Sequence, residues 1–166
     1  MQTVATVGDL VSLAVQAERN AEALYDGLSK MFIRYPEVAR FWAHYANEEA
    51  GHARWMLNLR NRICPDLLTR PADPELWSRA VKLVEPSVDD LLGGIHDLQD
   101  AWELANEMEH GETNLIFAFL IDNFTDDDLT LTFLRIQLRE HMEHLLVGLP
   151  VQFGDANLRR AITPNP

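Results

Sequence analysis

Residues 47–52 of the chain are Asn47-Glu48-Glu49-Ala50-Gly51-His52, and two of them decide how the sequence is interpreted. Glu49 and His52 lie three positions apart in a stretch with helical periodicity. A helix rises about 1.5 Å and turns about 100° per residue, so this spacing puts a carboxylate and an imidazole on one face, one turn apart. Such a pair can bind a metal ion, but Glu-x-x-His alone is also common on solvated faces. Further ligands must therefore come from elsewhere in the chain.

Helix start and stop signals around this stretch predict an all-α protein. Thr6 followed by Asp9, and Ser87 followed by Asp90, each place a hydroxyl cap three residues before an acid. Pro36 suits the first turn of a helix, where the missing N–H would be unpaired anyway. Together with the apolar periodicity, these signals predict four long helices at about 7–35, 36–63, 87–123 and 126–149.

The connections between these helices predict the architecture. Residues 64–86 contain four prolines and form a connection long enough to carry the chain from one end of a bundle to the other, with a short helix at about 74–84. The tail, 150–166, is expected to be peripheral. Two helical hairpins joined by one long crossover form a four-helix bundle, expected here as one domain over residues 1–166.

An internal repeat relates the two predicted hairpins. Glu18 and Glu109 are 91 residues apart, as are Glu49 and Glu140, and His52 and Glu143. A pseudo-two-fold arrangement of the hairpins would bring these side chains to one central point. Each half also carries apolar residues around these positions, so the acids fall inside the stripes that face the core. The predicted ligands are Glu18, Glu49, His52, Glu109, Glu112, Glu140, Glu143 and His144.

So many inward-facing carboxylates imply bound cations. Even after relaxation, a buried ion without a partner costs several kcal/mol, and two metal ions would compensate the charge. Oxygen-rich ligands with few imidazoles and no thiolate suit iron or manganese. Zinc could occupy the site but would bring no redox chemistry. We therefore expect two iron ions, with manganese or zinc as alternatives.

The chain resembles the ferritin-like di-iron carboxylate superfamily, and within it the rubrerythrin-like bundles. The resemblance spans about residues 7–149. It implies a ferritin-like four-helix bundle with Glu49 and Glu140 bridging two ions and with Glu18 and Glu109 as terminal ligands. In this pattern the helix at about 87–123 supplies Glu112 as a second carboxylate. The segments that carry it are Glu18 with Tyr25 seven residues on, Glu48-Glu49-Ala50-Gly51-His52, Glu109-His110-Gly111-Glu112 and Glu140-His141-Met142-Glu143-His144.

Two departures from the rubrerythrin-like pattern bear on function. The fourth helix usually has Glu-x-x-His, whereas here Glu143 occupies that step and His144 follows one residue later, rotated by about 100°. Either residue could be the ligand, or the second ion could bind weakly. The chain also has a single cysteine, Cys64, and so lacks the thiol pairs of a rubredoxin-type iron centre. Electrons must come from another protein or from the substrate metal.

The sequence supports three functions. The first is an oxidoreductase that reduces hydrogen peroxide or O2, with peroxide as the leading substrate and the electron donor unknown. The second is a ferroxidase or iron-handling protein that uses the same site. The third is a non-enzymatic helical bundle with a degenerate metal site, which the altered motif in the predicted helix at about 126–149 supports. In each case a homodimer or higher homo-oligomer is expected.

Composition excludes other classes. A net charge of −12 makes nucleic acid a poor partner, because affinity there depends on neutralising phosphates. No apolar run approaches the roughly 20 residues that span a bilayer, and no signal peptide is visible, so we expect a cytoplasmic protein without a membrane partner. The remaining histidines and Trp42, Trp55 and Trp102 are expected to have surface or packing roles. Tyr25 is expected in the core, with a hydrogen bond to a ligand carboxylate as the alternative.

Overall fold

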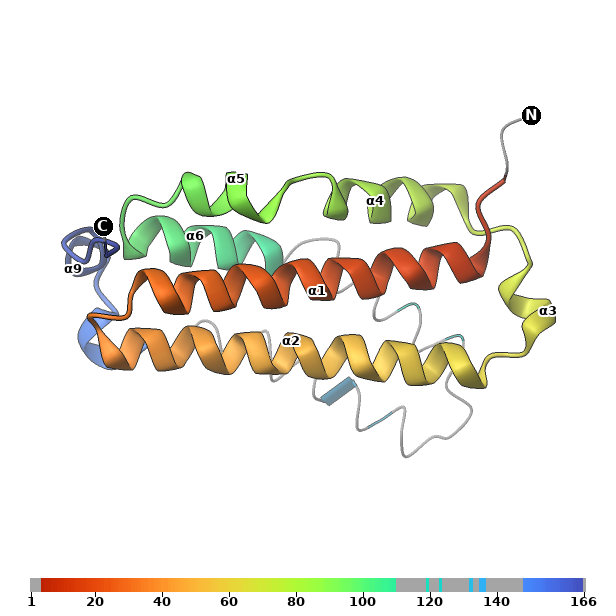
Figure 1. The fold of residues 1–166 in the computed structure, drawn as a ribbon, viewed down its shortest axis with the longest axis horizontal. Helices are drawn as coiled ribbons and strands as arrows, with labels where there is room; N and C mark the ends of the chain where they lie inside the picture. Colours follow the sequence, from red (N-terminus) through yellow and green to blue (C-terminus); the bar gives the residue numbers. More distant parts are fainter. Residues whose placement is uncertain are drawn as a thin grey trace.

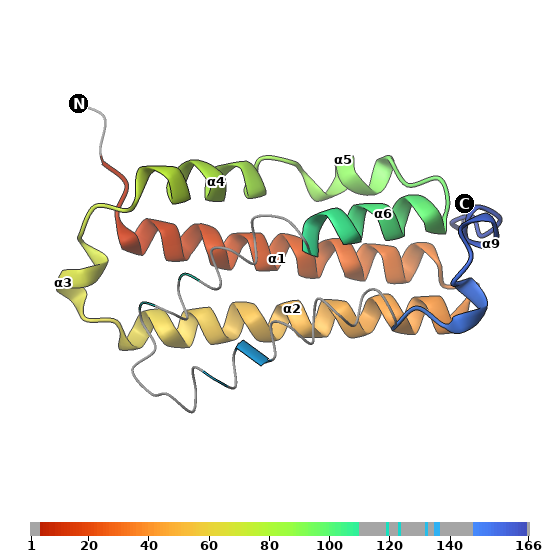
Figure 2. The ribbon, with the colours of Figure 1, turned by 180° about the vertical axis from the view of Figure 1, so that it is seen from behind.

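The computed structural model describes residues 4–109, 119, 123, 132, 135, 136 and 148–165. Two long antiparallel helices, α1 (Val7–Met31) and α2 (Pro36–Arg62), lie side by side in Figures 1 and 2. The other described elements are α3 (Pro65–Leu68), α4 (Pro74–Val84), α5 (Val88–Gly93), α6 (Leu98–Glu109), the 3-10 helix η1 (Val151–Phe153) and α9 (Ala156–Arg160).

The predicted start signals of the first two helices are confirmed. Thr6 and Asp9 form a capping box, in which the Thr6 hydroxyl accepts a 3.2 Å hydrogen bond from the Asp9 amide and the Asp9 carboxylate accepts one of 2.9 Å from the Thr6 amide. Pro36 occupies the first turn of α2. The second helix therefore starts where the sequence predicts, but α1 ends at Met31 instead of at about 35, and residues 32–35 form the turn between the two helices.

Two apolar clusters join α1 and α2, one at each end of the hairpin. The cluster near the interhelical turn includes Tyr25, Trp42 and Tyr45, none of them exposed, and α6 packs against it. The cluster at the opposite end includes Leu10 and Met56. Glu18 lies between the two clusters along α1, and Glu49 lies between them along α2.

The prediction of one continuous helix over 87–123 is wrong at its start. The Ser87 cap is present, with the hydroxyl accepting from the Asp90 amide at 3.1 Å, but α5 ends at Gly93 and the chain reverses direction. A second cap starts a new helix instead of continuing α5. The Asp97 carboxylate accepts a hydrogen bond from the Asp100 amide at 2.9 Å, and α6 begins at Leu98. The crossover therefore extends through residue 97 rather than ending at 86.

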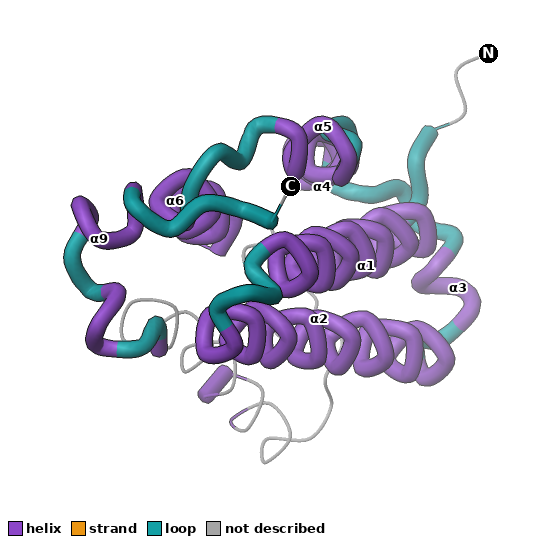
Figure 3. The backbone as a smooth tube through the Cα atoms, turned by 60° about the vertical axis from the view of Figure 1, so that its left-hand side comes forward, coloured by secondary structure: helices purple, strands orange, loops and turns teal. Residues whose placement is uncertain are grey.

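The crossover lies along α1, on the side away from α2, as Figures 1 and 3 show. The short helix predicted at 74–84 is confirmed as α4, with Asp73 as its cap. Backbone hydrogen bonds from Val7 to Arg70 and from Ala72 to Ala5, each of 2.9 Å, attach the start of the crossover to the start of α1.

The sequence predicted a peripheral C-terminal segment, and the structure corrects this prediction. Arg159 of α9 is 8% exposed and donates to the side chain of Gln99 at 2.6 Å, and its guanidinium lies 4.7 Å from the centre of the Trp102 ring. The Leu98 amide, at the start of α6, donates to the Ile162 carbonyl at 2.9 Å. The segment therefore closes the end of the bundle at which α6 begins.

The predicted fourth helix, 126–149, falls mostly outside the described residues. Thr132, Arg135, Ile136 and Gly148 are helical, and the helix has ended by Leu149, as the Gly148 and Pro150 stop signal predicted. The described residues contain no β-strand, only an isolated bridge between Thr6 and Pro71. The all-α helical bundle is thus confirmed. None of the described helices is long and apolar enough to cross a membrane.

Candidate metal centre

Glu18 and Glu49 face each other across the α1–α2 hairpin in the gap between its two apolar clusters. Their exposed fractions are 2% and 3%. Each lies in the apolar stripe of its helix, with Ala14 and Ala21 flanking Glu18 and with Tyr45 and Ala53 flanking Glu49. Acidic residues are almost never this buried without a partner, so their burial requires compensating charge.

His52 supplies the third group of the centre. Its Nδ1 atom lies 3.0 Å from Oε2 of Glu49 and 3.4 Å from Oε2 of Glu18. One ligand atom from each of the three residues lies within 4.8 Å of the others. The predicted convergence of these side chains is therefore present, and the three-residue spacing of Glu49 and His52 does put both on one face of α2.

Burial and mutual charge shift the titration of this group. Burial first, and then the charge of Glu49, raise the pKa of Glu18 well above its usual range. Burial alone would lower the pKa of His52, but the adjoining carboxylates of Glu18 and Glu49 raise it to about 10. Without a metal, the group therefore retains protons near neutral pH that a bound cation would displace.

The geometry fits a cation. Among the described residues, none makes a hydrogen bond to the buried Oε2 of Glu18, although His52 lies near it. A buried oxygen of this kind carries a desolvation cost that a metal ion would offset. Two carboxylates and one imidazole are ligands for iron or manganese, and also for zinc.

Glu109 is held next to the centre by Tyr25. Glu109 is 6% exposed, Tyr25 is fully buried, and the Tyr25 hydroxyl donates a 2.5 Å hydrogen bond to Oε1 of Glu109. Burial, then the charge of Glu109, then that of Glu49 raise the pKa of Tyr25 well above its usual value. Because both carboxylates act on one hydroxyl, Glu109 and Glu49 share a region of the core, although Glu109 is not part of the Glu18–Glu49–His52 group.

The other predicted ligands lie outside the described residues. They are Glu112, Glu140, Glu143 and His144. The choice between Glu143 and His144, and ligation itself at all eight positions, stay predictions. The sequence indicated Tyr25 only as an alternative hydrogen-bond donor. Its spacing of seven residues from Glu18 was the signal, and its partner could not be identified from α1 alone.

Acids beside the centre have ordinary surface partners. Glu48, adjacent to Glu49, lies 3.3 Å from His44, and Glu22, one turn beyond Glu18, pairs with Arg19 at 2.5 Å. His96 pairs with Asp100 at 3.2 Å and is largely exposed. Within the same helices, therefore, the buried acids converge on the centre, whereas the exposed acids pair with basic or histidine side chains one turn away.

A solved structure supplies the comparison that decides the fold. The chain is similar to a Thermotoga maritima protein whose crystal structure is described as that of a proposed ferritin-like diiron-carboxylate protein. The match has a TM-score of 0.64 and covers 88% of this chain and 95% of that one, at 20% sequence identity. The fold is ferritin-like. In this ferritin-like bundle, Glu18, Glu49 and His52 project from the first two long helices into the core.

No protein-family model matches the sequence, and no curated protein matches it. The ferritin-like fold is therefore shown by structure.

Proposed function

We propose that this ferritin-like chain is a di-iron carboxylate protein that reduces hydrogen peroxide or O2. The observation that carries the proposal is the buried group of Glu18, Glu49 and His52, whose ligand atoms lie within 4.8 Å of one another. The description of the Thermotoga maritima protein as a proposed diiron-carboxylate protein supports the choice of metal.

The residues divide between two ions. Glu18 and His52 would serve the first, Glu109 the second, and Glu49 both. Glu140 would also serve both ions, and Glu112, with Glu143 or His144, completes the predicted set for the second ion. When bound, the two irons would supply the electrons that reduce the oxidant.

The protein's own contribution is to hold these ligands dry and in place. The apolar clusters on either side of Glu18 and Glu49 exclude water, which strengthens the attraction between carboxylates and a cation. Tyr25 fixes one oxygen of Glu109, and with it the position of that carboxylate in the core. His52 must lose its proton to become a ligand, so metal binding and proton release are coupled.

Electrons for a catalytic cycle would come from an external donor. The chain has one cysteine, Cys64, which is exposed and free, and so cannot form a cysteine-ligated iron centre of its own. A separate donor protein is therefore part of the proposal. The expected homo-oligomer also belongs to it.

The test is iron loading under anaerobic conditions, followed by metal counting and mixing with peroxide or O2. The expected result is two irons per chain and an optical change that is faster with peroxide. Glu49→Gln should lose most of the bound iron, while Glu48→Gln should retain it, because Glu48 is the adjacent acid with a surface partner. Fewer than one iron per chain under several loading conditions would exclude the proposal. Accumulation of a ferric mineral without peroxide turnover would favour iron handling.

A further inference from the structure

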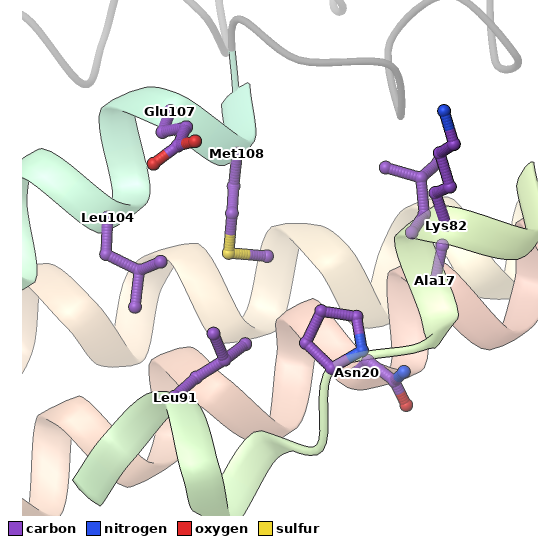
Figure 4. A pocket seen from close by; sticks show the side chains of 9 residues that line it. Ala17, Asn20, Lys82, Leu91, Leu104, Glu107 and Met108 are labelled. Carbon is purple, nitrogen blue, oxygen red and sulfur yellow. The ribbon is translucent and has the colours of Figure 1, made fainter. Parts of the chain in front are cut away.

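A cavity lies outside the candidate metal centre. It has a volume of about 340 Å³ and is bounded by α1, by the crossover and by α6 (Figure 4). Glu18, Glu49 and His52 do not line it. Ala17 does, and it is the neighbour of Glu18, so a turn of about 100° separates the residue that faces the cavity from the one that faces the centre.

The interior of this cavity is mostly apolar. In Figure 4 the side chains of Leu91, Leu104 and Met108 point into the same space, from the crossover and from α6. Ala17 and Leu83 add further apolar surface. The volume is near the lower end of the roughly 300–1,000 Å³ typical of small-molecule sites, and such sites combine an apolar lining with a few polar groups.

Pro86 and three polar side chains, Lys82, Asn20 and Glu107, complete the lining. Lys82 is one of two lysines in a chain of 166 residues with 26 acids. The other, Lys30, pairs with Asp26 at 2.5 Å on the surface. Lys82 makes no ion pair with any residue in the described part of the chain, and the nearby Arg79 lies 3.9 Å from Glu75. Among the described residues, Lys82 is thus a lysine beside an apolar cavity without an ion pair, whereas Lys30 has one.

We propose that this cavity binds a medium-chain aliphatic carboxylate. The hydrocarbon chain would lie against Leu91, Leu104 and Met108, and the carboxylate would meet the Lys82 ammonium. Each buried methylene group adds favourable free energy, which explains why the ligand needs a chain as well as a charge. The flexible stem of Lys82 can follow the ligand while its ammonium stays in water.

The opposite polarity, an amine facing Glu107, is less favoured. Glu107 and Lys82 are both exposed, but with 26 acids and only two lysines in the chain an acid at the rim is expected by chance and a lysine is not. In Figure 4, Glu107 and Lys82 lie on opposite sides of the cavity, so one ligand headgroup would meet only one of them. Because lysine is scarce in this chain, Lys82 identifies the ligand headgroup as a carboxylate.

The proposal is independent of the metal centre and is tested by titrating the full chain with decanoate below its micelle-forming concentration. Decanol and decylamine serve as matched probes with neutral and cationic headgroups. Binding is followed by calorimetry and by the methyl NMR signals of labelled methionines. The Met108 signal should shift, whereas Met56, buried in the cluster around Leu10, should not.

Two pairs of variants locate the ligand. Lys82→Gln should weaken decanoate binding by up to about fivefold and remove the preference over decanol, since an exposed charge pair contributes up to about 1 kcal/mol. Lys30→Gln is the matched control and should change nothing. Leu91→Trp should fill the cavity and abolish binding. Circular dichroism checks its fold, and Leu104→Phe replaces it if it unfolds.

Three results would overturn the proposal. The first is no decanoate binding up to about 1 mM, the weakest affinity that would support a specific site. The second is binding without a shift of Met108. The third is tighter binding of decylamine that Glu107→Gln weakens, which would assign the cavity to amines.

Discussion

The Tyr25 hydroxyl donates a 2.5 Å hydrogen bond to Oε1 of Glu109 and so joins α1 to α6 across 84 residues of sequence. Both side chains are buried, and Tyr25 also stacks on Trp42 with a centroid separation of 5.9 Å. The bond therefore fixes the position of Glu109 relative to the helix that carries Glu18. This relationship leads to the first prediction.

Tyr25→Phe should destabilise the metal-free protein by about 1–3 kcal/mol, because a buried carboxylate oxygen loses its donor while the ring packing is kept. Urea unfolding followed by circular dichroism measures the change. Tyr35→Phe, at the cap of α2, is the control and should alter the unfolding free energy by less than about 0.5 kcal/mol. An unchanged midpoint in Tyr25→Phe would contradict the importance of the bond.

Metal affinity should rise with pH between about 6 and 8. The pKa of His52 is raised to about 10 and that of Glu18 is also raised, so both groups tend to hold protons in this range that a metal must displace. Raising the pH lowers the cost of displacing them. Calorimetry of Mn²⁺ binding in buffers with different ionisation enthalpies measures the released protons. Binding that is independent of both pH and buffer would contradict the assignment of these residues.

Two glycines provide a matched test of packing between α1 and the crossover. A Cβ atom at Gly27 would lie 2.5 Å from Cδ1 of Leu92, so Gly27→Ala must displace Leu92 and should cost about 1 kcal/mol. Gly51→Ala meets no described atom within 4 Å and should stabilise α2 by about 0.5–1 kcal/mol. Thermal unfolding compares them. The reverse order of stability would mean that the crossover does not pack closely on α1.

Arg159→Ala should destabilise the bundle by about 2–3 kcal/mol. The change removes the donor to Gln99, which is 5% exposed, together with donors to the Phe153 and Gly154 carbonyls. Denaturant unfolding measures this loss. Arg160→Ala is the adjacent control, because Arg160 is exposed, and it should have little effect. Equal effects of both substitutions would show that the buried contacts of Arg159 do not matter.

Local signals in the sequence predicted much of the fold. The Thr6–Asp9 capping box, Pro36 at the start of α2 and the short helix from Pro74 all depend on residues within one turn of each other. The convergence of Glu18 on Glu49 and His52 was predictable because all three lie in apolar stripes of helices joined by a short turn.

Other features depend on competition or on distant partners. The Ser87 cap was recognised, but Asp97 offers a second cap ten residues later, and only packing decides that the chain reverses between them. Arg159 donates a hydrogen bond to Gln99, 60 residues away in the sequence, and nothing in the C-terminal segment itself identifies that partner. Single-sequence patterns carry no information about such pairings.

The position of Glu18 and Glu49 between two apolar clusters has a mechanical consequence. The clusters around Tyr25 and Leu10 hold α1 against α2 on both sides of Glu18 and Glu49. The width of the gap between the acids is then set by packing of leucine and aromatic side chains, and not by the ion. An ion that is too large would have to bend both helices against these clusters, so any selectivity of the centre for ionic radius would originate in residues that never touch the metal.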